Sequence, residues 1–328
     1  MLETAAHFLA KRNNAVDVNP PTADLHLTTN GSDWLWAVFS VMALSAIVIF
    51  VLGHATRPVG ERAFHELAAA LCATASVAYF ALASDLGSTP IYVEWKRGST
   101  VPGMPTRQIW YARYIDWTIT TPMLLLELLL TTGLPLSQIF IVIFFDIVMI
   151  ETGLVGALVR SRYKWGFYSF GCMALFLIWY FLLFPARASA ARLGSGFYKA
   201  YIISASILSF LWLLYPISWG LCEGGNVISV DSEMIFYGIL DLLAKPVFSF
   251  IHIFTIAKLD YARLGFSSGK VSDGAHQGLL EKNGNGAAST AETPRASTAT
   301  GLGGAENGVV GDGSRFHTAE NTRAEHPV

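Results

Sequence analysis

Seven long apolar stretches, separated by short polar ones, fill the middle of the chain. They cover residues 34–53, 66–86, 108–131, 137–159, 165–186, 200–222 and 234–257. A helix needs about 20 mostly apolar residues to cross the hydrocarbon core of a bilayer. Backbone groups in lipid must be satisfied within the segment, which favours helices over strands. The pattern therefore predicts an all-α membrane protein, a bundle of seven transmembrane helices.

Polar segments flank this apolar region and set the expected domains. Residues 1–33 form a polar N-terminal arm, residues 34–258 the membrane domain, and residues 259–328 a tail rich in glycine and charge. Such a tail cannot bury enough apolar surface to offset its ordering entropy, so we expect it to be disordered. An odd number of spans places the termini on opposite sides. Because eight Lys and Arg fall on each side, the positive-inside rule does not orient the chain.

Composition narrows the class further. Hydrophobic residues make up 53% of the 328 residues and charged residues only 14%, well below the roughly 25% of soluble domains. The net charge of −2 provides no basic surface for nucleic acid. The three cysteines have no metal-binding spacing, and we expect no metal site. We therefore expect a multi-pass membrane protein whose main surroundings are lipid.

Charged residues nevertheless lie inside three of the seven spans. An ionisable side chain in mid-membrane costs about 2.5–3.5 kcal/mol on insertion scales, so it usually marks a functional site. Arg113 and Glu151 lie near span ends, where a long side chain can reach the interface. The others lie well inside their spans: Asp116, Glu127, Asp146, Asp241 and Lys245.

Helical spacing places several of these groups on common faces. Asp116 and Glu127 are 11 residues apart. Eleven steps of about 100° return to within about 20° of the start, so both face one side, about 16 Å apart along the axis. Thr120 lies on the same stripe, and Asp241 and Lys245 are related as i and i+4. The spacing predicts a ladder of proton-handling groups beside a buried lysine.

The buried lysine has two interpretations. Lys245 is either a plain ion-pair partner of the acids, or it holds a carbonyl cofactor as a Schiff base, a role that suits buried lysines. Trp212, Tyr215 and Trp219 recur at i, i+3 and i+7, which puts three aromatic rings on one helix face. Such stripes are more often simple packing, but a long conjugated ligand on Lys245 needs a flat aromatic slot. The aromatic content therefore favours the second interpretation.

These residues also resemble a known family. Residues 112–122 (ARYIDWTITTP), 212–219 (WLLYPISW) and 241–245 (DLLAK) strongly resemble helices C, F and G of the microbial (type 1) rhodopsins. Residues 146–158 resemble helix D. The resemblance covers about residues 30–260, with four motifs in the correct order, and points toward bacteriorhodopsin and the fungal opsins.

The resemblance implies all-trans retinal linked to Lys245 as a protonated Schiff base, which light isomerises. Asp116 is then the primary counterion and proton acceptor, and Asp241 is the second counterion. Glu127 takes the place of the cytoplasmic proton donor. The other charged groups implied are Arg113, which links the acceptor to the outer side, and the paired release acids Glu223 and Glu233.

The resemblance also implies a retinal pocket and a topology. Tyr79 and Tyr215 match tyrosines that hydrogen-bond to the second counterion, and Thr121 and Asp146 match a bonded pair that links helices C and D. The family places the N-terminus outside and the C-terminus in the cytoplasm. The implied pocket residues are Trp117, Thr121, Met149, Gly153, Ser169, Met173, Trp212, Tyr215, Pro216 and Trp219.

Some positions depart from the family pattern or stay outside it. Ala68 stands where bacteriorhodopsin has a threonine that supports the donor, and Gly166 stands where a pocket tryptophan is expected. No role follows for Glu151. His65 and His252 lie near the ends of their spans, and we expect both at the membrane interface.

Together these positions predict a light-driven outward proton pump. Glu127 is surrounded by leucines, which do not solvate a carboxylate, so we expect it to be neutral at rest and able to return a proton. Its position toward the inner end, with Asp116 toward the outer end, makes the transport outward. Chloride pumps of the family replace the Asp116 carboxylate, and sensory members usually lack the donor acid.

Three alternatives stay open. The first is a slow-cycling photosensory rhodopsin of the same fold that signals through a partner, and the second is a light-gated channel. The third is a G-protein-coupled receptor, which the absence of Asp-Arg-Tyr after the third span and of Asn-Pro-x-x-Tyr in the seventh disfavours. We expect no enzymatic activity. The expected partners are the lipid bilayer and the transported proton, and a homo-oligomer is left open. The expected location is the plasma membrane.

Overall fold

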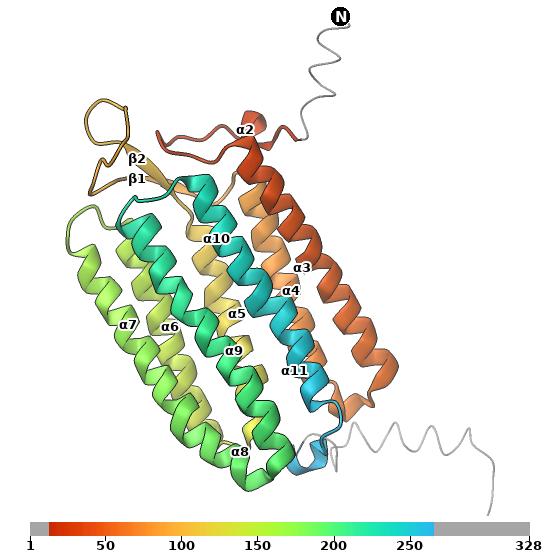
Figure 1. Cartoon of the computed structure of the whole chain (residues 1–328). Helices are drawn as coiled ribbons and strands as arrows, with labels where there is room; N and C mark the ends of the chain where they lie inside the picture. Colours follow the sequence, from red (N-terminus) through yellow and green to blue (C-terminus); the bar gives the residue numbers. More distant parts are fainter. Residues whose placement is uncertain (1–12, 266–328) are drawn as a thin grey trace, which may run out of the picture. The chain divides into compact units, whose positions relative to one another are not determined.

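A computed structural model describes residues 13–265, so nearly all of the predicted tail lies outside the described residues. Seven long helical segments form the bundle (Figure 1). They are α3 (Thr29–Thr56), α4 (Ala63–Ala83), α5 (Tyr111–Leu129), α6 (Leu136–Leu158), α7 (Lys164–Phe181) with α8 (Arg187–Leu193), α9 (Ser195–Trp219), and α10 (Val230–Leu242) with α11 (Phe248–Ile256).

The seven-helix prediction is confirmed. Six segments in the described part of the chain are long and apolar enough to cross a membrane by length and composition. The seventh is α5, which is more polar because it carries Arg113, Asp116 and Glu127. Each helix packs against its neighbours in sequence, and α10 packs on α3, so the helices close into a ring.

Two of the helical segments run well past the apolar stretches that predicted them. The first span was expected at 34–53, whereas α3 runs from Thr29 to Thr56. The fifth was expected at 165–186, whereas that segment continues through α8 to Leu193. Hydropathy detects only the part of a helix in hydrocarbon, and backbone hydrogen bonds carry the helix further into polar surroundings.

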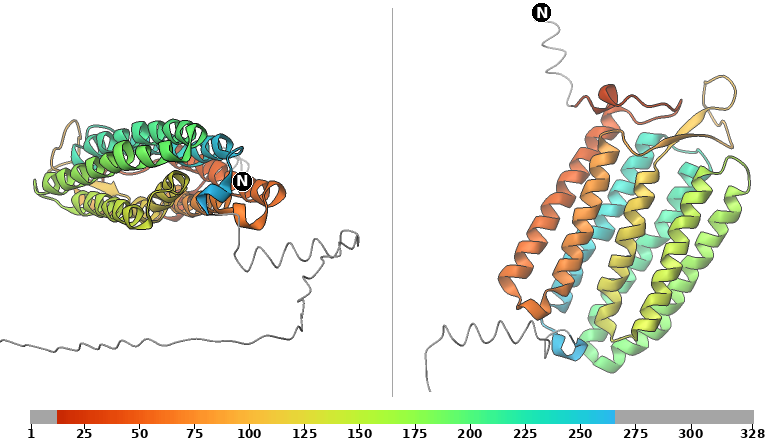
Figure 2. Two further views of the ribbon diagram at one scale, coloured as in Figure 1. Left: turned by 90° about the horizontal axis from the view of Figure 1, so that it is seen from below. Right: turned by 180° about the vertical axis from the view of Figure 1, so that it is seen from behind.

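Short elements distinguish the two ends of the bundle. At one end, named the hairpin end here, β1 (Thr89–Tyr92) pairs antiparallel with β2 (Thr106–Ile109). The short helix α2 (Ala15–Val18) precedes α3 at this same end (Figure 1). At the opposite end, named the far end, lie α8 and the 3₁₀ turns Val59–Glu61, Leu130–Thr132 and Tyr261–Leu264 (Figure 2).

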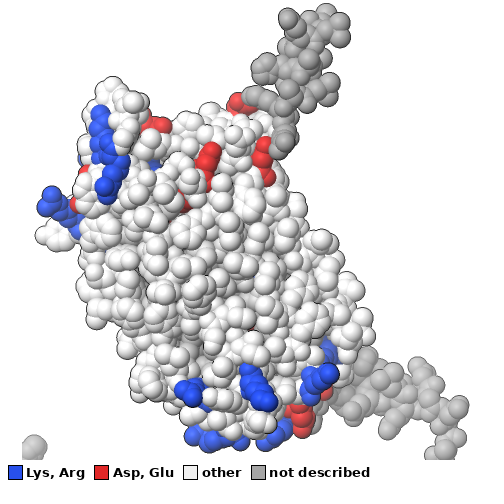
Figure 3. All heavy atoms as spheres, viewed as in Figure 1, with Lys and Arg blue, Asp and Glu red and all other residues white. Residues whose placement is uncertain are grey.

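The surface between the two ends is apolar. Many large hydrophobic side chains are exposed there, among them Leu44, Phe140 and Phe210, each 63–64% exposed. In Figure 3, Lys, Arg, Asp and Glu gather at the two ends and leave an uncharged belt between them. Exposed apolar surface on this scale suits contact with lipid chains, since soluble monomers rarely expose so much. The chain is thus a multi-pass membrane protein.

Three segments of the bundle have π-helical turns in place of regular α-helix: Leu182–Ala186, Gly220–Gly224 and Leu243–Val247. The last of these contains Lys245 and Pro246. Proline has no backbone N–H and clashes with the preceding turn, which disrupts the regular hydrogen-bond ladder. π-Helical turns are frequent at functional sites. The turn therefore sets the position of Lys245 in the bundle.

Candidate functional site

Lys245 lies in the middle of the bundle between two carboxylates. Its Nζ is 2.7 Å from Oδ2 of Asp116 on α5 and 3.2 Å from Oδ2 of Asp241, one turn earlier on its own helix. All three side chains are buried. A buried ammonium is tolerable only where opposite charges compensate it. The lysine and the two acids that the sequence singled out therefore form one ion cluster.

Asp241 is held by three donors besides the lysine. Tyr79 and Tyr215 donate hydrogen bonds to its two carboxylate oxygens at 2.7 and 2.6 Å, and Trp117 Nε1 lies 3.4 Å from Oδ1. Asp116 differs, because its Oδ1 has no hydrogen-bond partner among the described residues. Hydrogen bonds to a carboxylate favour its charged form. The geometry thus leaves one oxygen of Asp116 unpartnered among the described residues, whereas both oxygens of Asp241 are held.

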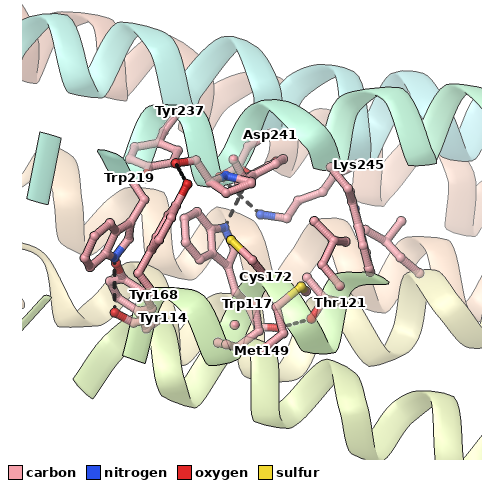
Figure 4. A pocket seen from close by; sticks show the side chains of 18 residues that line it. Tyr114, Trp117, Thr121, Met149, Tyr168, Cys172, Trp219, Tyr237, Asp241 and Lys245 are labelled. Carbon is pink, nitrogen blue, oxygen red and sulfur yellow. Dashed lines mark hydrogen bonds and ion pairs between the residues drawn. The ribbon is translucent and has the colours of Figure 1, made fainter. Parts of the chain in front are cut away.

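A cavity extends from Lys245 between α5, α6, α7 and α9 (Figure 4). It holds about 760 Å³ of space free of protein atoms, part of which is open to the outside. The Trp219 and Tyr168 rings stack with centroids 5.0 Å apart at its end. Eight of the ten pocket residues expected from the sequence line it: Trp117, Thr121, Met149, Gly153, Trp212, Tyr215, Pro216 and Trp219.

The prediction for helix α7 is wrong by one residue. Ser169 is exposed and Met173 is 60% exposed, and neither lines the cavity. Tyr168 and Cys172 line it in their place. One residue corresponds to about 100° around a helix, enough to move a side chain from the cavity to the outer face.

The same one-residue offset applies to Gly166, where the resemblance expected a pocket tryptophan. Trp165, the residue before it, packs against Trp219 with ring centroids 5.7 Å apart and against Tyr168 at 5.5 Å. Its Nε1 donates to Glu94 at 2.9 Å. A tryptophan therefore does stand at this end of the cavity.

A second charged cluster lies between the lysine and the hairpin end. Arg113 Nη1 is 2.7 Å from Oε1 of Glu233 and 3.5 Å from Oε1 of Glu223. The Tyr114 and Tyr237 hydroxyls donate to Glu223 at 3.2 and 3.3 Å. The structure thus brings together Arg113 and the two acids that the resemblance paired.

Sequence reasoning missed Arg107, which completes this cluster. It comes from strand β2, is 2% exposed, and its Nη2 is 2.7 Å from Oε2 of Glu233. Its Nη1 donates to Asn226 Oδ1 at 2.8 Å. Burial is the largest single effect and opposes its charge, but the attraction and hydrogen bond to Glu233, together with the nearby Cys222 and Glu223, outweigh burial and raise the pKa of Arg107. The pairing of the hairpin turns the side chain inward, and no helical periodicity could reveal that.

Glu127 lies toward the far end from Asp116 and is fully buried. The Ser249 hydroxyl of α11 donates to its Oε2 at 3.2 Å, while Oε1 has no partner in the described chain. Ala68 offers no hydroxyl at the position where the resemblance expected one. Ser249, on a different helix, is therefore the group that contacts this acid.

Two further hydrogen-bonded pairs involve acids of the spans, one inside the bundle and one at its surface. Thr121 donates to Asp146 Oδ2 at 2.8 Å and links α5 to α6, the pairing that the resemblance implied. Glu151 is exposed and accepts a hydrogen bond from Thr118 at 3.0 Å. Within residues 13–265, no group of three or more His, Cys, Asp or Glu is placed to hold a metal ion.

The two histidines lie near helix ends, as expected, but their side chains face the inside of the bundle. His65 is 2% exposed and His252 is fully buried. His252 Nδ1 is 2.8 Å from the Ser204 hydroxyl, which satisfies one side of the ring inside the bundle.

The fold and this buried lysine cluster define a class of seven-helix membrane proteins, and comparison with known proteins names it. The sequence profile of the bacteriorhodopsin-like proteins matches residues 30–259. The chain belongs to this family, the microbial rhodopsins, which implies a retinal chromophore. Protein FDD123 of Trametes versicolor is 54% identical over 261 residues, covering 80% of this chain and 90% of that protein.

Two solved structures show the same fold. The light-driven proton pump rhodopsin of Coccomyxa subellipsoidea is 36% identical, with a TM-score of 0.66, covering 70% of this chain and 98% of that one. The light-driven proton pump of Leptosphaeria maculans is 34% identical, with a TM-score of 0.68, covering 72% and 99%.

The one-residue correction on α7 can be tested by colour. Cys172→Leu adds bulk to the cavity wall, so we expect it to shift the visible absorption maximum of the retinal-bound protein. Met173→Leu changes an outward-facing side chain and should leave the maximum unchanged. Absorption spectra of the two purified variants beside the parent protein decide the matter, and a shift confined to Met173→Leu would restore the original assignment.

Proposed function

We propose that this protein is a light-driven outward proton pump in which retinal is bound to Lys245 as a protonated Schiff base. The observation that carries the proposal is the contact of Lys245 with Asp116, with a second buried acid, Glu127, on the same face of α5. Eleven residues of helix separate the two acids by about 16 Å. An acceptor on one side of the amine and a donor on the other favour directional transport.

The residues around the cavity fit a long conjugated aldehyde. Lys245 lies at one end of the cavity and can form the imine, and the walls are mainly aromatic and apolar. When bound, retinal supplies the absorption of light and the isomerisation that follows. We propose the all-trans isomer in the dark, as the family resemblance implies.

The protein's own groups then handle the proton. Asp116 accepts the proton from Nζ of Lys245. Its Oδ2 is already in contact with Nζ, and its Oδ1 is unpartnered within the described residues. Asp241 is held in place by hydrogen bonds from Tyr79 and Tyr215. Glu127 later returns a proton to Nζ from the opposite side. A buried acid in apolar surroundings is neutral at rest and is therefore able to donate.

Release follows through the second charged cluster. Arg113 lies between the acceptor and the two acids Glu223 and Glu233, and Arg107 holds the outer oxygen of Glu233. A charge that appears on or leaves Asp116 changes the potential at Arg113 and, through it, at the acids. Both acids are therefore placed to release a proton toward the hairpin end, where Arg107 borders a surface hollow.

This direction of transport sets the orientation. We propose that the hairpin end and the N-terminus are outside, and that the far end and the C-terminus are cytoplasmic, in a plasma membrane. The named function of the Coccomyxa and Leptosphaeria relatives supports pumping over catalysis. An enzymatic activity is not proposed.

Illumination of cells that express the protein with retinal should acidify an unbuffered medium, and a protonophore should abolish the signal. Glu127→Gln removes the donor and should lower steady pumping about 100-fold, in the range of positioned acid–base groups. Glu151→Gln is the matched control, since that side chain is exposed on the outer face. A coloured protein that produces no acidification would reject pumping and favour the photosensor, and a current that reverses with the ion gradient would indicate a channel.

A further inference from the structure

His252 is a buried titratable group that the proposed proton path does not use. It is fully buried on α11, between Phe248, whose ring is parallel at 5.7 Å, and Phe64 of α4 at 6.1 Å. Its Nδ1 contacts the Ser204 hydroxyl of α9 at 2.8 Å. Its Nε2 has no hydrogen-bond partner among the described residues. A buried imidazole with one free nitrogen is an unusual element of a packed apolar core.

The position of His252 in the bundle connects it to the donor acid. Lys245, Ser249 and His252 are related as i, i+4 and i+7 on one helix, so they share a face. Ser249 donates to Glu127, and His252 lies about 4.5 Å further along the axis. The main chain of Glu127 is also close enough to interact electrostatically with the imidazole. Among the described residues of this region, His252 thus lies beyond Glu127 toward the far end.

Among the residues that the structure describes here, His252 is the group suited to pass a proton. Phe64 separates it from Tyr261, whose ring is 5.4 Å from Phe64 and lies under the Arg57 guanidinium. Burial raises the pKa of Tyr261 to about 12, so its hydroxyl stays protonated at neutral pH. The groups that face the imidazole from the neighbouring helices are Glu127, Ser204 and Phe64.

We propose that His252 is the relay that reprotonates Glu127 from the cytoplasmic side. The inference rests on the proposed pump, because it assumes that Glu127 gives up its proton during the cycle. The relay requires a resting tautomer in which Nδ1–H donates to the Ser204 hydroxyl and Nε2 carries the lone pair. A proton from the far end binds Nε2 and forms the imidazolium. It then passes to the Glu127 carboxylate, through the Ser249 hydroxyl or a water, which restores neutral imidazole and neutral acid.

This assignment separates two rates that a flash experiment measures. Transfer from Glu127 to Nζ of Lys245 does not involve His252, whereas the later uptake of a proton from the medium does. In His252→Gln we therefore expect imine reprotonation within about twofold of the parent, while proton uptake slows by about 100-fold. A pH-indicating dye in the medium reports uptake, and visible absorption reports the imine.

Two further variants serve as a control and as a second test of the relay. His65→Gln makes the same change at the other buried histidine, which contacts neither Glu127 nor Ser249 in any described interaction, and should leave both rates unchanged. Ser204→Ala keeps the imidazole but removes its Nδ1 partner, and should slow uptake to a lesser degree. It also serves as the test if His252→Gln fails to fold.

A measurement that needs no light tests the resting state. ¹⁵N NMR of histidine-labelled protein should show a signal, absent in His252→Gln, with protonated Nδ1 and unprotonated Nε2. Unchanged uptake in both His252→Gln and Ser204→Ala, or a protonated Nε2 at rest, would overturn the relay. If Glu127→Gln itself fails to slow imine reprotonation, the donor assignment fails first and the relay falls with it.

Discussion

Lys245→Ala is expected to yield a colourless protein when retinal is supplied. No other amine of the described residues lines the cavity, so the imine cannot form and the visible absorption band should be lost completely. Removal of the amine also leaves Asp116 and Asp241 without their cation. Breaking a buried ion pair in this way typically costs about 3–5 kcal/mol. The absorption spectrum of the purified variant is the measurement.

Two further variants separate loss of colour from loss of fold. Lys164→Ala removes another buried lysine, whose Nζ donates to the main-chain carbonyl of Glu223, and should keep the colour. Lys245→Ala combined with Asp116→Asn removes one of the uncompensated charges and should recover stability but no colour. A visible band that persists in Lys245→Ala would contradict the assignment of the attachment site.

Asp116→Asn should give a coloured protein that does not pump. The amide cannot accept the proton from Nζ, so light-driven acidification should fall at least about 100-fold. Loss of the negative charge 2.7 Å from Nζ should also move the absorption maximum to longer wavelength, because positive charge is held less tightly at the nitrogen.

The control for this variant is Asp146→Asn. Asp146 is a buried carboxyl of similar environment, but it bonds to Thr121 and does not contact Lys245. We expect it to alter the cavity wall slightly and to leave pumping largely intact. Pumping at the parent rate in Asp116→Asn, measured as medium acidification per absorbed photon, would remove Asp116 from the path.

The sequence was sufficient for the bundle and for the pairing of Asp241 with Lys245 because both follow from rigid geometry. Bilayer thickness sets the length of each span, and helical spacing sets which residues share a face. Asp241 and Lys245 are one turn apart on their helix, and that relation survives in any packing. The contact with Asp116 also needed the relative depth of two helices, which spacing within one helix does not provide.

The misplaced positions share a physical cause. α7 carries large apolar or aromatic side chains on every face, so its pattern does not distinguish Tyr168 and Cys172 from Ser169 and Met173. Arg107 is buried by strand pairing and by contacts with residues more than 100 positions away. Ser249 approaches Glu127, and His252 approaches Ser204, only through the packing of three helices. These features depend on tertiary contacts and not on local periodicity.

Time-resolved infrared spectroscopy after a flash tests the central claim most directly. The account predicts that a protonated carboxylic acid band appears at the same rate as the imine loses its proton, and that this band is absent in Asp116→Asn. A second band should disappear as the imine regains its proton, and it should be absent in Glu127→Gln. Imine deprotonation without a new acid band, or with a band that Asp116→Asn retains, would contradict the account.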